Sequence, residues 1–84
     1  MPIRRKIAIK VISDGHEPIT YKMLTHTKLS TMMKKYAECE LGEPLSILLF
    51  LYDGSVLDQT DTPQMLSMND GDIVEVVVKQ TGGN

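Results

Sequence analysis

The feature that most constrains this chain is a change in hydrophobic spacing, from every second residue to helical spacing and back again. Apolar residues alternate with their neighbours in 6–11 and again in 74–79, as in half-buried β-strands. Between 29 and 41 they recur at helical spacing. Because 84 residues allow only one domain, the strands and the helix must share one small core. This length excludes a two-lobed enzyme and a dinucleotide-binding fold.

The central helix has recognisable ends. Thr27 is a plausible N-cap, because its hydroxyl can accept a hydrogen bond from a free backbone N–H of the first turn. Gly42 suits the left-handed residue that follows a helix, and Pro44 prevents the helix from resuming. These signals predict one helix of about 13–14 residues.

Turn residues separate the remaining apolar runs. The strands that we expect are 6–11, 19–23, 47–52, 55–57 and 74–79. Ser13-Asp14-Gly15 joins the first two as a hairpin, and Asp53-Gly54 closes a tight turn between the third and fourth. Residues 62–65 are a candidate single helical turn, in which Pro63 is tolerated.

This order of elements predicts an α+β protein of the β-grasp type, a mixed sheet of four to five strands with one helix packed across it. The first and last strands can pair in parallel at the centre, because the helix supplies the crossover. We expect a short N-terminal arm at 1–5, the domain at 6–79 and a flexible tail at 80–84.

Composition excludes several classes. Cys39 is the single cysteine, so neither a disulfide framework nor a cysteine-rich zinc site can form, and nothing indicates a cofactor or a metal. No apolar run reaches the length of a signal or membrane segment, which favours an intracellular protein without membrane contact.

The charge is distributed unevenly along the chain. Residues 1–36 carry eight basic and two acidic residues, and residues 37–84 carry nine acidic residues and one basic residue. Two oppositely charged halves can offer two surfaces to two kinds of partner.

Five segments, taken in order, resemble the small ubiquitin-like modifier (SUMO) family of the ubiquitin-like superfamily. The segments are His26-Thr27-Lys28-Leu29-Ser30, Phe50-Leu51-Tyr52-Asp53-Gly54, Thr60-Asp61-Thr62-Pro63, Asp72-Ile73-Val74-Glu75-Val76 and Gln80-Thr81-Gly82-Gly83. The resemblance extends from about Lys6 to Gly83, and the final Gln-Thr-Gly-Gly separates the chain from ubiquitin itself.

The resemblance implies a protein modifier and not an enzyme. In such a modifier the carboxylate of Gly83 is adenylated by a SUMO activating enzyme, carried as a thioester to the SUMO conjugating enzyme and joined to a substrate lysine by an isopeptide bond. Gly82 and Gly83 suit this role, because residues without a Cβ can lie extended in a narrow tunnel. The sequence ends in Asn84, so we expect a SUMO-specific cysteine protease to cleave the Gly83–Asn84 bond. The family also implies a monomer in the nucleus and cytoplasm.

The resemblance further implies two binding surfaces. The first is a groove between the second strand and the helix, where a hydrophobic SUMO-interacting peptide adds as an extra strand. The matching residues are Ile19, Tyr21, Lys22, Met23, Met32, Lys35 and Tyr36. The second is an acidic surface for the conjugating enzyme, formed by Asp53, Gly54, Asp70 and Asp72.

Three positions depart from the family pattern. Leu24 and Thr31 stand where lysine is usual, which predicts a more apolar, less charge-dependent groove. Leu49 replaces a usual arginine and, if it faces solvent, extends an apolar strip with Leu51 that indicates a partner site or self-association.

Other functions find little support in the residues. A nucleophilic enzyme would have to combine Cys39 with His16 or His26, which lie on separate elements. A nucleic-acid site would rest on Arg4-Arg5-Lys6, which lack an interleaved aromatic residue. The competing interpretation is a SUMO-like interaction domain that is never conjugated, although such a domain has no need of Gly82-Gly83.

Overall fold

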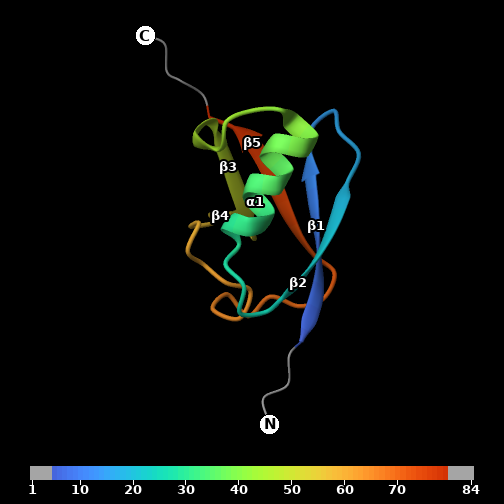
Figure 1. The fold of residues 1–84 in the computed structure, drawn as a ribbon, viewed down its shortest axis with the longest axis vertical. Helices are drawn as coiled ribbons and strands as arrows, with labels where there is room; N and C mark the ends of the chain where they lie inside the picture. Colours follow the sequence, from blue (N-terminus) through green and yellow to red (C-terminus); the bar gives the residue numbers. More distant parts are fainter. Residues whose placement is uncertain (1–4, 80–84) are drawn as a thin grey trace.

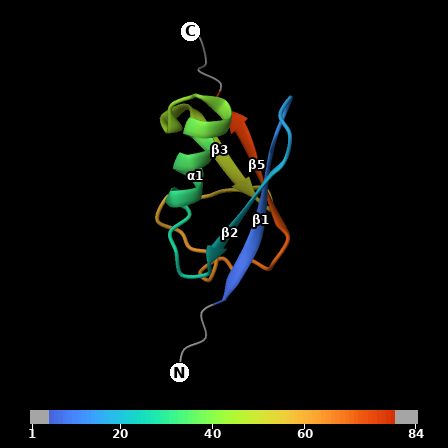
Figure 2. The ribbon, with the colours of Figure 1, turned by 45° about the vertical axis from the view of Figure 1, so that its right-hand side comes forward.

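The computed structural model describes residues 5–79 as a five-stranded sheet with one helix across a single face (Figures 1 and 2). The strands are β1 (Lys6–Ser13), β2 (Ile19–Leu24), β3 (Leu48–Tyr52), β4 (Ser55–Val56) and β5 (Asp72–Val78). The helical segments are α1 (Ser30–Tyr36), a π-helical turn (Ala37–Leu41) and a 3₁₀ turn (Leu45–Ile47). Across the sheet the strand order is β2-β1-β5-β3-β4.

The parallel pairing predicted for the sheet centre is confirmed. β1 lies beside β5 in parallel, with Val11 opposite Val74, and each of these strands has an antiparallel partner on its other side. The α1 segment makes the crossover that a parallel pair requires. The β-grasp fold class is therefore confirmed, and β2 is left as one edge of the sheet.

The helix begins later than the sequence suggested, and the Thr27 cap was wrong. The backbone N–H of Thr27 donates to the carbonyl of Leu24 at 3.1 Å, and α1 starts at Ser30 without a side-chain cap. Backbone carbonyls of the 59–61 loop accept instead from the N–H groups of Leu29 and Ser30. A distant loop thus satisfies the free donors of the first turn, a solution that local sequence cannot reveal.

The helix ends where expected, but in a wider turn. Gly42 has φ 63°, and its N–H donates to the carbonyl of Ala37, five residues earlier. Bonds of this span define the π-helical turn Ala37–Leu41. The left-handed backbone at Gly42 explains the glycine, because a Cβ is unfavourable in that region.

Several further boundaries differ from the sequence-based prediction. β1 extends to Ser13 and not only to 11, β2 to Leu24 and not 23, β4 ends at Val56 and not 57, and β5 spans Asp72–Val78 and not 74–79. Ile47 was predicted to open the third strand but closes a 3₁₀ turn, and its carbonyl accepts from the N–H of Lys79 at 2.7 Å. Residues 63–67 form a hydrogen-bonded turn instead of a helix, with the Thr62 hydroxyl accepting from the N–H of Met65 at 3.1 Å.

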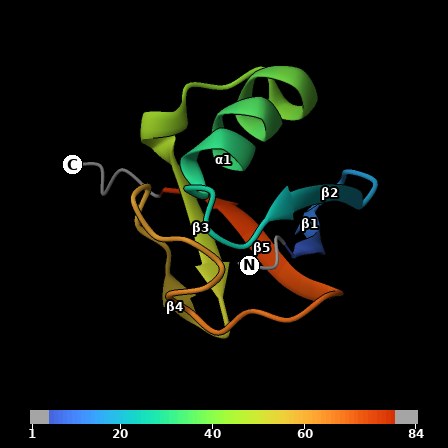
Figure 3. The ribbon, with the colours of Figure 1, turned by 60° about the horizontal axis from the view of Figure 1, so that its bottom comes forward.

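The core lies between α1 and the inner face of the sheet. It contains Ile7, Ile9, Val11, Leu29, Met32, Met33, Tyr36, Phe50, Val74 and Val76, among others. These are the residues that the two hydrophobic periods brought to a common side. The opposite face of the sheet carries the alternate residues of the same strands, and no described helix covers it (Figure 3).

Candidate functional site

A shallow groove of about 80 Å³ lies between the edge strand β2 and α1. It is lined by Tyr21, Lys22, Met23, Thr31, Met32 and Lys35. Within residues 5–79, no strand pairs with the outer edge of β2, so its backbone can still accept an added strand. Met23 and Met32 are buried to 9% and 3% exposure and form an apolar floor, whereas Lys22 and Lys35 are exposed.

The structure brings five of the seven predicted groove residues together. The remaining two, Ile19 and Tyr36, do not line the groove. Ile19 is half-buried at the start of β2 and packs against the core. Tyr36 has no exposed surface and lies beneath the groove, where its ring meets Tyr21 edge-on at a centroid distance of 6.4 Å. The family resemblance placed Tyr36 at the groove but could not show that Tyr21 covers it.

Tyr36 lies beneath the groove and packs against Tyr21, one of the lining residues. Its hydroxyl shares a 2.6 Å hydrogen bond with the Ser13 hydroxyl, and its ring also meets Phe50 edge-on at 6.3 Å. A buried phenol needs such a partner, because an unpaired polar group in the core is costly. Burial, followed by the nearby Glu40 carboxylate, raises the pKa of Tyr21 above its ordinary value. Tyr21 therefore stays neutral at physiological pH and offers the groove an aromatic, uncharged side.

Thr31, which the sequence marked as a departure from the family pattern at the groove, does line it. It is exposed on the first turn of α1 and lines the groove opposite β2. Thr31 and Lys35 are one helical turn apart and share a face of the helix. The groove thus has two exposed lysines and a neutral hydroxyl at its rim.

The predicted acidic surface lies at one end of the sheet, where two turns meet. Asp53 and Asp72 line one shallow hollow with Tyr52, Gly71 and Ile73. Asp53 and Gly54 both have positive φ angles, 53° and 82°, as a tight hairpin turn between β3 and β4 requires. Gly54 itself is not part of the hollow's lining.

Two of the acidic residues, Asp70 and Asp72, also accept hydrogen bonds that stabilise the fold. Asp72 Oδ2 accepts from the Asn69 N–H at 2.8 Å and from the Tyr52 hydroxyl at 2.7 Å, and these bonds lower the pKa of Asp72. Asp70 Oδ1 accepts from the Ala8 N–H at 2.6 Å, so this carboxylate is turned toward β1. Asp53 is exposed, and no hydrogen bond of its side chain is seen in residues 5–79.

The conjugation and processing residues Gly82, Gly83 and Asn84 lie outside the described residues, as do residues 1–4 and 80–81. Cys39 is an exposed thiol on the π-helical turn. In the part of the chain that the structure describes, no three His, Cys, Asp or Glu side chains are grouped to hold a metal ion. No helix within 5–79 is long and apolar enough to span a membrane.

The fold and the open β2 edge define the class of protein. Two solved structures that share this architecture are ubiquitin-like. The chain superposes with a TM-score of 0.80 on Caldiarchaeum subterraneum ubiquitin, at 21% identity, over 94% of this chain and 100% of that one. The N-terminal ubiquitin-like domain of the 4931431F19Rik protein gives 0.75 at 20% identity, over 100% of this chain and 85% of that one. At these identities the likeness establishes the ubiquitin-like fold.

Sequence comparison identifies the family within this class. Residues 7–78 match the family described as ubiquitin-2 like Rad60 SUMO-like. Small ubiquitin-related modifier 3 of Danio rerio is 37% identical over 78 residues, covering 93% of this chain and 82% of that protein. Small ubiquitin-related modifier 2 of Homo sapiens is 38% identical over 77 residues, covering 92% and 80%. The chain belongs to the SUMO-like family of ubiquitin-like proteins.

Proposed function

We propose that this chain is a SUMO-type protein modifier, joined through the carboxylate of Gly83 to lysines of other proteins after removal of Asn84. The observation that carries the proposal is the position of the diglycine. Gly82-Gly83 follows shortly after β5, the last strand of a domain that is 37% identical to a small ubiquitin-related modifier over 93% of the chain. Glycines beyond a compact domain suit transfer, because the carboxylate can enter a narrow enzyme site while the domain stays outside.

The proposed role makes the chain a substrate of enzymes and not a catalyst. Its partners are the SUMO activating enzyme, the SUMO conjugating enzyme, a SUMO-specific cysteine protease and the substrate lysines. The acidic end of the sheet supplies a surface for a basic face of the conjugating enzyme. Asp53 is exposed there, whereas the Asp70 and Asp72 carboxylates already accept hydrogen bonds within the domain. Because exposed charges are screened by salt, this association weakens as ionic strength rises.

The β2–α1 groove is the binding site for proteins that recognise the modifier non-covalently. An extended peptide can add to the open edge of β2 and place apolar side chains over Met23 and Met32. Lys22 and Lys35 are placed to attract acidic residues beside the apolar core of such a peptide. With Thr31 in place of a third cation at the rim, apolar contact contributes a larger share of the affinity.

A reconstituted conjugation reaction tests the proposal. The chain ending at Gly83 is incubated with ATP, the activating and conjugating enzymes of the SUMO pathway, and a substrate protein. A slower-migrating product that survives reducing agent indicates an isopeptide bond, because a thioester would be cleaved. The control chain, which lacks residues 82–84, should give no product yet bind peptide normally. If neither chain forms the product while both bind peptide, the chain is an interaction domain and the conjugation proposal is overturned.

Processing and peptide recognition are tested separately. Incubation of the full chain with a SUMO-specific protease should lower its mass by one asparagine, and an unchanged mass contradicts the processing step.

Peptide binding in the groove is tested by titrating a peptide with an apolar core and acidic flanks against labelled protein. Lys35→Glu should weaken binding, whereas Lys28→Glu, the same charge change at an exposed position outside the groove, should not. Equal effects of the two variants would show that only net charge matters.

Location in the nucleus and cytoplasm is part of the same proposal and rests on the family. Fluorescence microscopy of the chain tagged at its N-terminus, which leaves Gly83 free, measures it directly. Exclusion of the tagged chain from the nucleus would contradict the proposed location.

A further inference from the structure

The apolar floor of the β2–α1 groove consists of two methionines, one from each wall. Met23 comes from β2 and Met32 from α1, and both line the groove. They are 9% and 3% exposed. The remaining lining residues all end in a polar group; they are Tyr21, Lys22, Thr31 and Lys35. The purely apolar side chains that the groove offers to a peptide are therefore both thioethers.

A thioether differs from an aliphatic side chain in that peroxides oxidise it readily. The sulfur lone pair attacks one oxygen of hydrogen peroxide, the O–O bond breaks, and an S–O bond forms. The departing hydroxide takes the proton of the transferred oxygen and leaves as water, so the sulfur is oxidised by two electrons and the peroxide is reduced by two. The product, methionine sulfoxide, is polar, and sulfoxide reductases convert it back to methionine. A floor of leucine or valine would be inert to the same oxidant.

Hydrogen peroxide can reach this floor because the groove lies at the edge of the sheet. Within residues 5–79 no strand pairs with the outer edge of β2, and the groove holds about 80 Å³ of free space. A water molecule takes about 30 Å³ in the liquid, so a peroxide molecule of roughly twice that size fits. Met23 has more exposed surface than Met32 and should therefore react first.

A sulfoxide in the floor would weaken the apolar part of peptide recognition. In the free chain water can hydrate the sulfoxide oxygen, but an apolar peptide side chain laid over it would leave that acceptor buried without a partner. The ammonium groups of Lys22 and Lys35 do not react with peroxide and keep their attraction for acidic residues. Because only the electrostatic contribution remains after oxidation, the residual binding should depend more strongly on salt.

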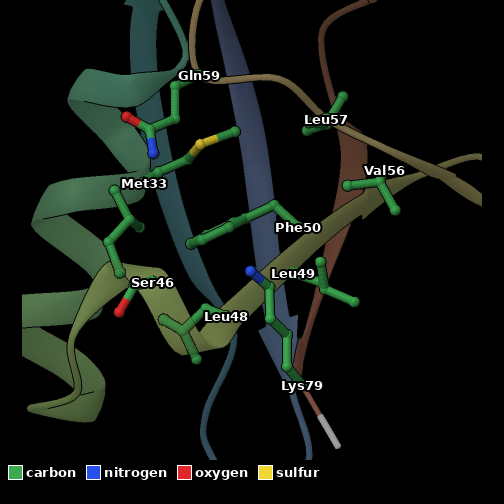
Figure 4. Close-up of a pocket in the computed structure, with 10 residues that line it drawn as sticks. Met33, Ser46, Leu48, Leu49, Phe50, Val56, Leu57, Gln59 and Lys79 are labelled. Carbon is green, nitrogen blue, oxygen red and sulfur yellow. The ribbon is translucent and has the colours of Figure 1, made fainter. Parts of the chain in front are cut away.

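Two other methionines serve as internal references for this reaction. Met65 is 65% exposed and lies outside the groove lining, so it should report the dose of oxidant. Met33 is 2% exposed, but it lines a different hollow, beside β3. Figure 4 shows the Met33 side chain between those of Gln59 and Phe50. Comparison with these two methionines separates an effect on the groove from general oxidation of the chain.

We propose that Met23 and Met32 form a peroxide-sensitive site, whose oxidation weakens peptide binding in the groove and whose reduction by a thiol-dependent sulfoxide reductase restores it. This regulation rests on the proposed function of the groove as a peptide-binding site. The exposed thiol of Cys39 does not line the groove, and its oxidation is a separate reaction. Because the proposed site does not involve Gly83, the free full-length chain is sufficient to test it.

The test measures oxidation and peptide affinity in the same samples. The full-length chain with Cys39→Ser, which removes thiol chemistry, is treated with increasing hydrogen peroxide, and mass spectrometry of its fragments measures oxidation at each methionine. Titration calorimetry measures the affinity for a peptide with an apolar core and acidic flanks. The affinity should stay constant while only Met65 is oxidised, and it should fall at least about tenfold once Met23 and Met32 are sulfoxides. Treatment with a methionine sulfoxide reductase and a thiol reductant should restore it.

Bound peptide provides a second readout. At saturating peptide the oxidation of Met23 and Met32 should slow, because the peptide covers the groove, whereas Met65 should react at an unchanged rate. NMR spectra of the oxidised chain should keep the dispersed amide signals of a folded domain, with shifts concentrated at the groove.

Leucine variants make the test specific to the floor, because leucine has a similar volume to methionine but no sulfur. Each variant is compared with itself before and after peroxide, so a change in its starting affinity does not affect the result. The affinity of Met23→Leu/Met32→Leu should be the same before and after treatment, and each single variant should lose less affinity than the parent chain. Met33→Leu, the control at a similarly buried position outside the groove, should lose as much affinity as the parent.

The outcomes separate the peroxide-sensitive site from the groove function itself. If the untreated chain does not bind the peptide, both proposals are overturned. If it binds, the peroxide-sensitive site alone is overturned by unchanged affinity after oxidation of Met23 and Met32, by an equal loss in the double leucine variant, or by resistance of both methionines to peroxide. Loss of the dispersed NMR signals on oxidation would also overturn it, because binding would then be lost with the fold and not through the groove floor.

Discussion

The Tyr52 hydroxyl donates a 2.7 Å hydrogen bond to Asp72 Oδ2, which joins the end of β3 to the start of β5. The same carboxylate oxygen accepts from the Asn69 N–H and so closes the turn that precedes β5. One aspartate thereby connects the two turns that form the acidic end of the sheet. The turn before β5 is also tied to β1, since Asp70 Oδ1 accepts from the Ala8 N–H and the Gly71 N–H donates to the Ala8 carbonyl. The Tyr52–Asp72 bond adds a link from this turn to the end of β3.

Replacement of Tyr52 by phenylalanine tests this connection. Tyr52→Phe keeps the ring but removes the donor to Asp72, so the free energy of unfolding should fall by about 1 kcal/mol at neutral pH. Urea unfolding monitored by circular dichroism measures the change. Asp53→Asn is the matched control, because Asn tolerates the left-handed backbone and Asp53 is exposed; its effect should lie within about 0.5 kcal/mol. Equal losses in both variants would contradict a specific Tyr52–Asp72 contribution.

The same pair should make stability depend on pH at both extremes. The Asn69 N–H and then the Tyr52 hydroxyl hold the pKa of Asp72 below its ordinary 3.8, so its contribution is present above that value and is lost as pH falls through the folded pKa. The hydrogen bond to Asp72 is also the main cause that raises the pKa of Tyr52 above 10.0, so this contribution is lost as pH rises through the raised pKa. Unfolding free energies of wild type and Tyr52→Phe should therefore converge in acid. A constant difference across the acid range would contradict this linkage.

Tyr36 provides a third prediction, on the layer beneath the groove. Tyr36→Phe removes only the hydroxyl bond to Ser13 and should cost about 1 kcal/mol of unfolding free energy. Tyr36→Ala also removes a fully buried ring and should cost about 3–5 kcal/mol, a large share of the stability of so small a domain. Because Tyr36 lies below the groove and not in its lining, Tyr36→Phe should keep full affinity for the acidic-flanked peptide. A large loss of affinity would show direct contact with the peptide.

The extent to which sequence predicted this fold can be traced to particular residues. The alternation of Ile7, Ile9 and Val11 with Lys6, Ala8 and Lys10 indicates one buried face, and the helical spacing from Leu29 to Tyr36 indicates another. Those two patterns were sufficient for the β-grasp arrangement. Thr27 was misjudged, because the first turn of α1 is satisfied by backbone carbonyls of the 59–61 loop. Such contacts join residues far apart in the chain, and local capping preferences carry no information about them.

For the candidate site as well, some features were predicted before the structure and others were not. The resemblance to the family located the groove between β2 and α1, and Tyr21, Met23 and Met32 do line it. It could not separate the lining of the groove from the layer below it, since Tyr36 and Met32 lie one helical turn apart and differ only in what covers them. Depth in a core depends on packing against other elements, and the helical period alone does not encode it.

Gly42 gives a prediction about the end of the helical segment. Its φ of 63° is unfavourable for a residue with a Cβ, although the space around it is open. Gly42→Ala should therefore lower the unfolding free energy by about 1 kcal/mol through backbone strain alone. Gly42→Asn should cost less, because asparagine visits the left-handed region more readily. Equal costs for the two variants would point to a lost contact and not to the backbone angle.

Thr31 gives the final prediction, because it occupies the groove rim one helical turn before Lys35. Thr31→Lys adds a third cation to the exposed rim and should tighten binding of an acidic-flanked peptide by a few-fold, in line with about 0.2–1 kcal/mol for an exposed ion pair. Since such a gain is electrostatic, it should shrink as salt is added, whereas apolar contact with Met23 and Met32 should not. Isothermal titration at low and high salt measures both. Lys28→Thr, which changes the charge away from the groove, is the control and should alter neither the affinity nor its salt dependence. A gain in Thr31→Lys that persists unchanged in high salt would mean that the lysine stem, and not its charge, contacts the peptide.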